Sequence, residues 1–147
     1  MKQLFVVFIL VLALFSSCNR EKQVVEESYP DGSPKRVCIY KGRGESRQIL
    51  KETTYYESGK TQMEGGFKEN KRDGQWVYFY ENGKKWSEGF FKNGKNEGKR
   101  LTYYENGQVR YEAWYKDGER VGKWKFFDDK GNLLKEVDYD KAAGVKE

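Results

Sequence analysis

The chain has 147 residues, of which 28 are Lys or Arg, 23 are Asp or Glu and none is His, so its formal net charge at pH 7 is +5. Without His, the sequence excludes zinc–histidine sites and every catalytic arrangement that uses imidazole. Its aromatic content of 16% is too high for a disordered chain, and its acidic and basic residues are interspersed, unlike the basic stripe of a nucleic-acid-binding protein. We therefore expect no nucleic-acid partner, no metal site and no cofactor.

Residues 1–17 have the pattern of an export signal. A Lys near the N-terminus is followed by twelve apolar residues, Leu4 to Phe15, long enough for a signal peptide and too short to span a bilayer about 30 Å thick. The segment ends in Phe15-Ser16-Ser17-Cys18, which resembles the bacterial lipobox, although that family usually has an aliphatic residue in place of Phe15. The resemblance implies cleavage before Cys18 and lipidation of that cysteine. An ordinary cleavable signal or a short anchor is the alternative.

Lipidation of Cys18 implies an exported protein. Two or three acyl chains hold a domain firmly on a membrane, because each buried methylene contributes about 0.8 kcal/mol. Asn19, rather than an Asp, follows the cysteine, so nothing argues for retention at an inner membrane. We expect a lipoprotein of the outer membrane or periplasm in which residues 18–28 form a flexible tether. Cys38 then lacks a disulfide partner and is expected to be a small apolar strand residue.

An internal repeat with a period of 24 residues covers most of the remaining chain. Four landmarks recur at this spacing. They are the turn sequences that begin at Tyr56, Tyr80, Tyr104 and Asp128, the glycines Gly74, Gly98 and Gly122, the glutamates Glu64, Glu88, Glu112 and Glu136, and the aromatics Phe67, Phe91, Tyr115 and Tyr139. We interpret residues 29–140 as about four and a half units, the first of them irregular, and residues 141–147 as a frayed tail.

Each unit carries two turn signals about half a period apart, such as Asn82-Gly83 and Asn93-Gly94. Segments of strand length rich in Tyr, Phe and Trp lie between the turns, and no apolar stripe with helical spacing follows the leader. The sequence therefore predicts an all-β fold, an elongated single-layer antiparallel meander of repeated β-hairpins with about nine strands. Gly65 and Gly89 are expected to leave room for rings from adjacent strands. The expected scaffold residues of the repeat are Tyr56, Gly59, Trp76, Tyr80, Gly83, Tyr104, Gly107 and Trp124.

The run from Tyr80 to Tyr104 (YENGKKWSEGFFKNGKNEGKRLTYY) resembles the bacterial variant of the MORN repeat. The resemblance covers about Ser28 to Asp140 and departs from the family pattern at Gly42-Arg43-Gly44. It implies an elongated hairpin array used for interaction or scaffolding, with protein or membrane partners and no catalysis of its own. Related bacterial chains are often labelled antitoxin-like, which implies an antitoxin or immunity role.

Four aromatic residues are the candidates for a surface that binds a protein partner whose identity the sequence does not reveal. Trp86 and Trp114 fall at different places in their units, so the repeat does not require them, and Phe90 and Tyr111 lie near them in the sequence. Aromatic and Arg side chains dominate the hot spots of protein interfaces. The alternative is that each ring only holds the sheet together.

Other function classes stay open beside this one. Hairpin repeats rich in Gly, Trp and Tyr also resemble cell-wall-binding repeats, in which rings stack on sugars, so a glycan partner is the second hypothesis, with Trp76 and Trp124 as the rings to test. Contact with anionic lipid headgroups beneath the tether is a third. Carboxylate pairs can catalyse hydrolysis without His, but the four recurring glutamates are explained more simply by pairing with Lys or Arg. We therefore expect no enzymatic activity and no catalytic residues.

Overall fold

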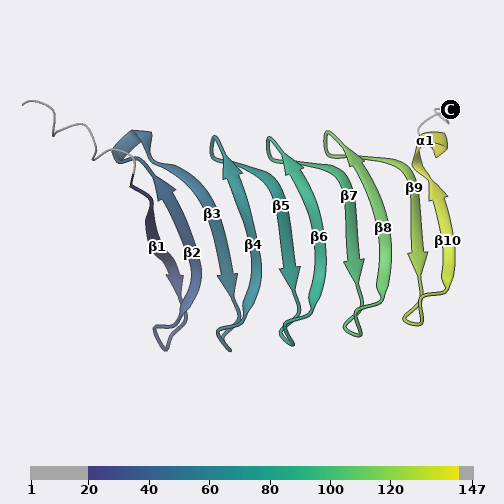
Figure 1. Ribbon diagram of the computed structural model, residues 1–147, viewed down its shortest axis with the longest axis horizontal. Coiled ribbons are helices and arrows are strands. Elements are labelled where there is room, and N and C mark those ends of the chain that lie inside the picture. Colours follow the sequence, from purple (N-terminus) through teal and green to yellow (C-terminus); the bar gives the residue numbers. More distant parts are fainter. Residues whose placement is uncertain (1–19, 143–147) are drawn as a thin grey trace, which may run out of the picture.

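The computed structural model describes residues 20–142, which form one open sheet of ten antiparallel strands (Figure 1). The signal segment 1–17, Cys18 and the tail residues 143–147 lie outside the described residues. The strands are β1 (Lys22–Ser28), β2 (Pro34–Lys41), β3 (Gln48–Tyr55), β4 (Thr61–Lys68), β5 (Lys71–Phe79), β6 (Lys85–Lys92), β7 (Lys95–Tyr103), β8 (Val109–Lys116), β9 (Glu119–Phe127) and β10 (Leu133–Asp138), with a 3₁₀ turn η1 (Gly44–Ser46) and a short helix α1 (Tyr139–Ala142).

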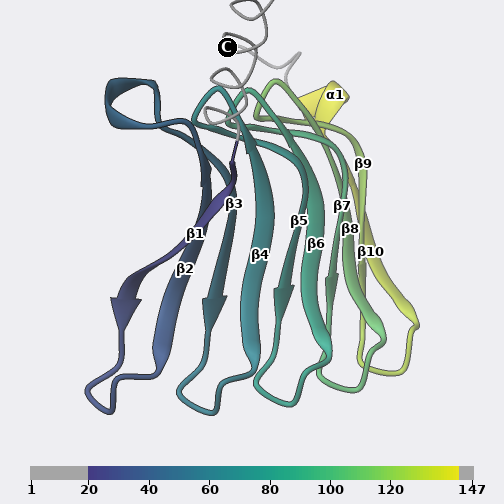
Figure 2. The same cartoon turned by 60° about the vertical axis from the view of Figure 1, so that its left-hand side comes forward.

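Every strand pairs with the strands that precede and follow it in the chain, so the sheet is a meander without a crossover. The predicted all-β, single-layer hairpin array is thereby confirmed, with ten strands in place of about nine. Figure 2 shows the strands bent along their length and no second layer over either side of the sheet. Among residues 20–142, no helix has the length and apolar character needed to cross a membrane.

The hairpins close with one turn geometry at one end of the sheet, which we call the tyrosine turns. In the turn that begins at Tyr80, the Gly83 N–H donates to the Tyr80 carbonyl at 2.9 Å and the Tyr80 N–H donates to the Lys84 carbonyl at 2.8 Å. Gly83 has a φ of +86°, which glycine adopts without strain. The same bonds recur in the turns that begin at Tyr29, Tyr56, Tyr104 and Asp128.

Each of these tyrosines also ties its unit to the next one. The Tyr56 hydroxyl donates to the Phe79 carbonyl at 2.7 Å, and the Tyr80 hydroxyl donates to the Tyr103 carbonyl at 2.7 Å. Equivalent bonds join Tyr29 to Tyr55 at 2.7 Å and Tyr104 to Phe127 at 2.8 Å. Each of these tyrosines satisfies a strand-end carbonyl about one repeat away, which is the contact expected of a scaffold residue.

Pairing irregularities recur with the repeat as well. The register shifts after Thr54, Tyr78 and Thr102, which are 24 residues apart, and it shifts again near Gly65, Glu88 and Glu112 in the other pairings. A β-bulge bends its strand and increases the local twist. A bulge in each pairing therefore gives the sheet the curvature visible in Figure 2.

Most of the apolar core lies on one side of the single-layer sheet. Trp76 is fully buried at 0% exposure and Trp124 is 5% exposed. We call the side that bears these two rings the tryptophan face, and the side that bears Glu64, Glu88, Glu112 and Glu136 the glutamate face. Gly65 and Gly89 lie opposite Trp76 on the two neighbouring strands, and a Cβ at Gly65 would overlap the Trp76 ring. The expectation that Gly65 leaves room for a ring is confirmed, whereas Gly89 makes room for the Arg100 side chain.

The expectation of a flexible tether over residues 18–28 is wrong for Lys22–Ser28, which form β1 and pair with β2. This strand is charged and lacks aromatic residues, so its composition does not indicate a strand. The backbone ladder with β2 holds it, and ion pairs add to this, because Glu26 lies 3.0 Å from Arg47 and Glu27 lies 3.8 Å from Arg36. At the other end, residues 141 and 142 of the expected tail belong to α1, which packs on β9.

Candidate interaction surface

The glutamate face carries a ladder of cross-strand ion pairs. Lys51 lies 2.7 Å from Glu64, Lys99 lies 3.3 Å from Glu112 and Lys123 lies 2.9 Å from Glu136. In the remaining unit Gln75 takes the place of the lysine, and its amide donates to Glu88 at 3.1 Å while Lys85 approaches the same carboxylate at 2.9 Å. The interpretation of these glutamates as structural partners of basic residues is confirmed.

Glu88 has the most elaborate of these environments. The Tyr103 hydroxyl donates to its carboxylate at 2.6 Å, and this bond, with the help of Lys85, lowers the pKa of Glu88 although burial opposes the shift. Burial, followed by the same hydrogen bond, raises the pKa of the Tyr103 phenol. At neutral pH a charged Glu88 and a protonated Tyr103 therefore stabilise each other.

The tryptophan face is organised around one position of the repeat, which holds Glu52, Trp76, Arg100 and Trp124 in successive units. Phe67 and Phe91 meet the Trp76 ring edge-on with centroids 5.3 and 5.9 Å away, and the Trp76 indole N–H donates to the Gly66 carbonyl at 3.1 Å. Trp124 has matching neighbours in Tyr115 and Tyr139, and its indole N–H donates to the Trp114 carbonyl at 3.2 Å. Both rings are therefore packed into the sheet, each at the centre of its unit.

Arginine side chains lie against these rings. The Arg72 guanidinium lies 4.0 Å from the Trp76 ring centroid, and the Arg120 guanidinium lies 5.0 Å from that of Trp124. The Arg100 guanidinium lies 5.7 Å from the Tyr78 ring. Such contacts stabilise a cation by about 0.5–2 kcal/mol and hold a planar guanidinium in a fixed position.

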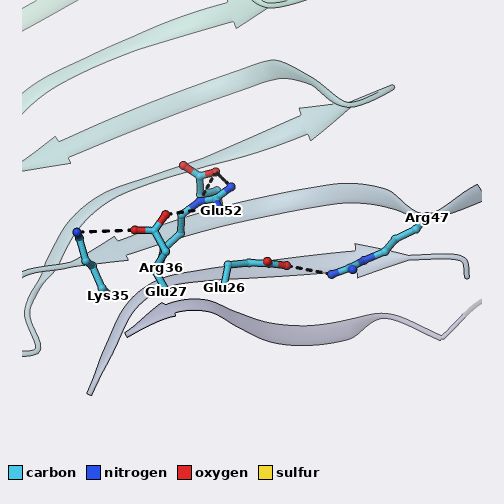
Figure 3. A network of polar contacts seen from close by, with 6 residues as sticks. All are labelled: Glu26, Glu27, Lys35, Arg36, Arg47 and Glu52. Carbon is cyan, nitrogen blue, oxygen red and sulfur yellow. Dashed lines mark hydrogen bonds and ion pairs between the residues drawn. The ribbon is translucent and has the colours of Figure 1, made fainter. Parts of the chain in front are cut away.

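Arg36 and Arg47 of the first unit are neutralised by nearby carboxylates (Figure 3). Glu52, with a side chain 11% exposed, accepts hydrogen bonds from Arg36 Nε at 3.2 Å and from Arg36 Nη2 at 3.1 Å. Arg47 pairs with Glu26 at 3.0 Å and lies 3.5 Å from the Tyr40 ring centroid. Burial, reinforced by Glu26, raises the pKa of Tyr40 to about 12. The guanidinium groups of Arg36 and Arg47 are therefore occupied by carboxylates.

The four residues predicted to form one binding surface are divided between the two faces. Trp86, 44% exposed, meets Tyr78 edge-on at 5.9 Å, and Tyr111 stacks parallel to Trp124 at 6.2 Å, so both lie on the tryptophan face. In the strand register, Phe90 lies opposite Gln75 and Glu97, and Trp114 lies opposite Lys99. Phe90 and Trp114 therefore lie on the glutamate face. The prediction of a single surface is wrong, because strand alternation sends Phe90 and Trp114 to the opposite side.

Phe90 and Trp114 are nevertheless similar to each other. They are 24 residues apart, so they occupy the same position in consecutive units, and they are 51% and 44% exposed. Trp86 is exposed for a different reason. It lies at the bulge between the Tyr78–Ser87 and Phe79–Lys85 pairs, where no residue of β5 stands opposite it.

The sequence interpretation overlooked the arginines of the tryptophan face. The signal for them is present in the repeat, since Arg72 and Arg120 occupy equivalent positions with Asn96 between them, four residues before Trp76, Trp124 and Arg100. Where one unit replaces its tryptophan with Arg100, it also replaces its arginine with Asn96, and Arg100 donates to the Asn96 side chain at 2.9 Å. Such a paired exchange cannot be recognised from the recurring residues alone.

No curated protein matches the chain. Among solved structures, the crystal structure of a mutant of S. aureus TarM in complex with fondaparinux, alpha-GlcNAc-glycerol and UDP is similar to it, with 13% sequence identity and a TM-score of 0.32. The alignment covers 88% of this chain and 24% of that chain, so this chain spans about a quarter of that protein's length.

The repeat itself gives a family match. The family described as "MORN repeat variant" matches residues 50–69, 72–93, 96–117 and 120–141, which coincide with the hairpins from β3 to β10. Repeats of this family are generally non-enzymatic modules for interaction with proteins or membranes. More than half of the sequence is matched by these four repeats, and the chain therefore belongs to the MORN repeat variant family.

Proposed function

We propose that the chain is a bacterial lipoprotein of the cell envelope that binds a protein partner through its tryptophan face. One observation carries the choice of face. Arg72, Arg100 and Arg120 lie against aromatic rings there, and the exposed ring of Trp86 adjoins them through Tyr78. This combination of aromatic and Arg side chains is the one that dominates protein-interface hot spots.

The proposed anchor is the lipidated Cys18, and the fold sets how far the sheet can lie from it. Since β1 begins at Lys22, the link from Cys18 spans at most about 14 Å of extended chain. The β1 edge of the sheet would therefore be held beside the membrane, with both faces standing free. In this placement the sheet would present a surface to other proteins of the envelope.

An antitoxin or immunity role is a narrower form of the same proposal. It is supported by the resemblance to antitoxin-like chains, and in this form the partner is a toxic protein whose active surface the sheet covers. Co-expression with the captured partner tests it. The partner alone should slow growth and this chain should restore it, whereas a harmless partner would leave only the broader interaction role.

The proposal is tested by affinity purification of the full-length protein from its own envelope, read by mass spectrometry. A double substitution Trp86→Ala and Tyr111→Ala should release the partner, while Phe90→Ala with Trp114→Ala on the glutamate face should retain it. Retention by both variants, or equal release, would contradict the choice of face. The mass of the mature N-terminus tests the anchor, with Cys18→Ser as the control that remains unlipidated.

Glycan binding is the alternative function, and the exposed rings of Trp86 and Trp114 favour it because an open aromatic surface can stack on a sugar. Trp76 and Trp124, the rings first considered for this role, are buried and cannot do so. If insoluble peptidoglycan retains the protein and Trp86→Ala or Trp114→Ala releases it, the glycan function replaces the protein-binding one. The recovery of wall fragments in place of a protein would give the same answer.

A further inference from the structure

The arginines of the tryptophan face form a regular series. Arg72 is on β5, Arg100 on β7 and Arg120 on β9, so successive members are two strands apart. At about 4.8 Å per strand, this separation is about 10 Å across the sheet. Arg100 starts four residues farther along its strand than the other two, but it reaches back to Asn96, which stands at their position in the repeat. The exchange of Asn96 and Arg100 therefore keeps a positive charge in the series.

These three charges are not neutralised by the part of the chain that the structure describes. Within residues 20–142, no carboxylate lies within 4.0 Å of Arg72, Arg100 or Arg120. Their polar contacts there are neutral, namely the Tyr78 hydroxyl for Arg72, Asn96 and Ser87 for Arg100 and the Tyr139 hydroxyl for Arg120. By contrast, Arg36 and Arg47, and the lysines Lys51, Lys99 and Lys123 of the glutamate face, have carboxylate partners.

The gaps in this series are filled by aromatic residues. Phe91 lies 5.6 Å from the Arg72 guanidinium. Tyr115, at the equivalent position in the next unit, is near both Arg100 and Arg120, whose charges act to lower its pKa while burial, the larger effect, raises it. Fixed guanidinium groups separated by partly buried rings give a ligand alternating positive and apolar contacts.

We propose that this series, Arg72, Arg100 and Arg120, binds an extended acidic segment of the partner protein that runs across the strands with a carboxylate at every third residue. Three residues of a segment in the extended polyproline II conformation span about 9 Å and return to the same side of the segment, so carboxylates at this spacing can reach successive arginines. Each guanidinium has donors free for a carboxylate, and such charge-assisted bonds are about twice as strong as neutral ones. The proposal rests on the protein-binding function above and specifies the chemistry of the partner.

A protein segment fits these observations better than a membrane surface does. The arginines lie on alternate strands, β5, β7 and β9, and Arg72 and Arg100 are only partly exposed among aromatic rings. A membrane surface is recognised by clusters of outward basic residues, whereas a line of charges at a regular spacing selects an elongated ligand. Binding to anionic vesicles is therefore an outcome that the test must separate from peptide binding.

The test uses the full-length chain purified in detergent and two synthetic peptides of equal composition. One peptide has glutamate at every third position, and the other has the same glutamates in one block. Fluorescence anisotropy at physiological salt should show the spaced peptide binding about tenfold more tightly than the block peptide. Equal affinities would overturn the proposal, because charge alone would then explain binding.

The variants locate the site. Arg72→Gln, Arg100→Gln and Arg120→Gln together should weaken binding about tenfold or more, and Arg120→Gln alone, at an exposed position, should weaken it about threefold without a risk to folding. Lys51→Gln, Lys99→Gln and Lys123→Gln together make the same change in net charge on the glutamate face and should leave affinity within about twofold. Equal losses from the two triple variants would contradict the assignment.

Vesicles of equal parts phosphatidylcholine and phosphatidylglycerol form the final arm. If the wild type binds the vesicles through these arginines but does not bind the spaced peptide, the series serves a membrane and the proposal is wrong. The envelope purification separates this failure from that of the protein-binding function. A partner that is still captured by the triple arginine variant would keep that function and remove the acidic-segment proposal.

Discussion

The first unit and the later units solve the same packing problem with different chemistry. At one position of the repeat the first unit has Glu52, held by Arg36 on the neighbouring strand, while the second and fourth units have the buried rings of Trp76 and Trp124. Both kinds of unit share the tyrosine turn and its hydrogen bond to the next hairpin. The backbone and the tyrosines therefore define the fold, and the central position can be ionic, aromatic or, at Arg100, open to a ligand.

The largest expected effect comes from removing an aromatic centre. Trp76→Ala deletes a fully buried ring between two phenylalanines and should lower the free energy of unfolding by about 3–5 kcal/mol. Because each repeat contacts only its neighbours, the loss should be local, with faster hydrogen exchange in β4 to β6 than at the ends of the sheet. Urea unfolding and hydrogen exchange measure both effects.

Trp86→Ala is the matched control for this substitution. It removes the same side chain from an exposed position on the same face and should cost less than about 1 kcal/mol. Similar losses for the two variants would show that the single layer does not distinguish its buried ring from its exposed one, and would contradict the description of Trp76 as the centre of its unit.

The ionic centre should be weaker than the aromatic one. Glu52→Gln leaves the partly buried Arg36 guanidinium with only the more distant Glu27, and should cost about 1–3 kcal/mol. Glu64→Gln, which breaks an ion pair whose two side chains are 46% and 38% exposed, should cost less than about 1 kcal/mol. Hydrogen exchange in β2 and β3 reports the first change. Equal costs would mean that burial adds nothing to the Arg36–Glu52 pair.

The sequence predicts the regular units well because their signals are local. The turn glycines, the tyrosines and the recurring glutamates are each read from a few neighbouring residues and a fixed spacing, and the structure assigns them the expected scaffold roles. β1 could not be predicted in this way, because its pairing strand β2 and the arginines Arg36 and Arg47 lie about 10–20 residues away in an irregular unit. The composition of residues 22–28 alone does not indicate this pairing.

The candidate site shows a second limit of the sequence. Trp86 and Tyr111 lie on the tryptophan face, but Phe90 and Trp114 face the other way. Proximity along a strand does not give a common face, because each residue reverses the direction of the side chain and each bulge resets that alternation. The arginine series was missed for a related reason, since it depends on the exchange between Asn96 and Arg100 and not on a residue that recurs.

A smaller effect is expected from the bond that the first unit and the later units share. Tyr80→Phe removes the 2.7 Å hydrogen bond to the Tyr103 carbonyl and should cost about 0.5–1.5 kcal/mol. Tyr29→Phe removes the equivalent bond in the first unit and should cost the same amount, measured by urea unfolding and by hydrogen exchange in the following hairpin. A much smaller loss at Tyr29 would show that the first unit is held by its ion pairs alone.

The smallest expected effect depends on pH and concerns the glutamate face of a later unit. The pKa of Glu88 is lowered by Tyr103 and Lys85, so its charged form contributes stability that is fully present above the unfolded pKa of about 4.5 and is lost as the pH falls through the lower folded value. The stability difference between the wild type and Glu88→Gln should therefore be constant near neutral pH and shrink below about pH 4.5. Tyr103→Phe removes the largest cause of the shift and should weaken this pH dependence without removing Glu88. If Tyr103→Phe left the acid side of the stability profile unchanged, the phenol would not be the group that holds Glu88 in its charged form, and Lys85 would have to carry that role alone.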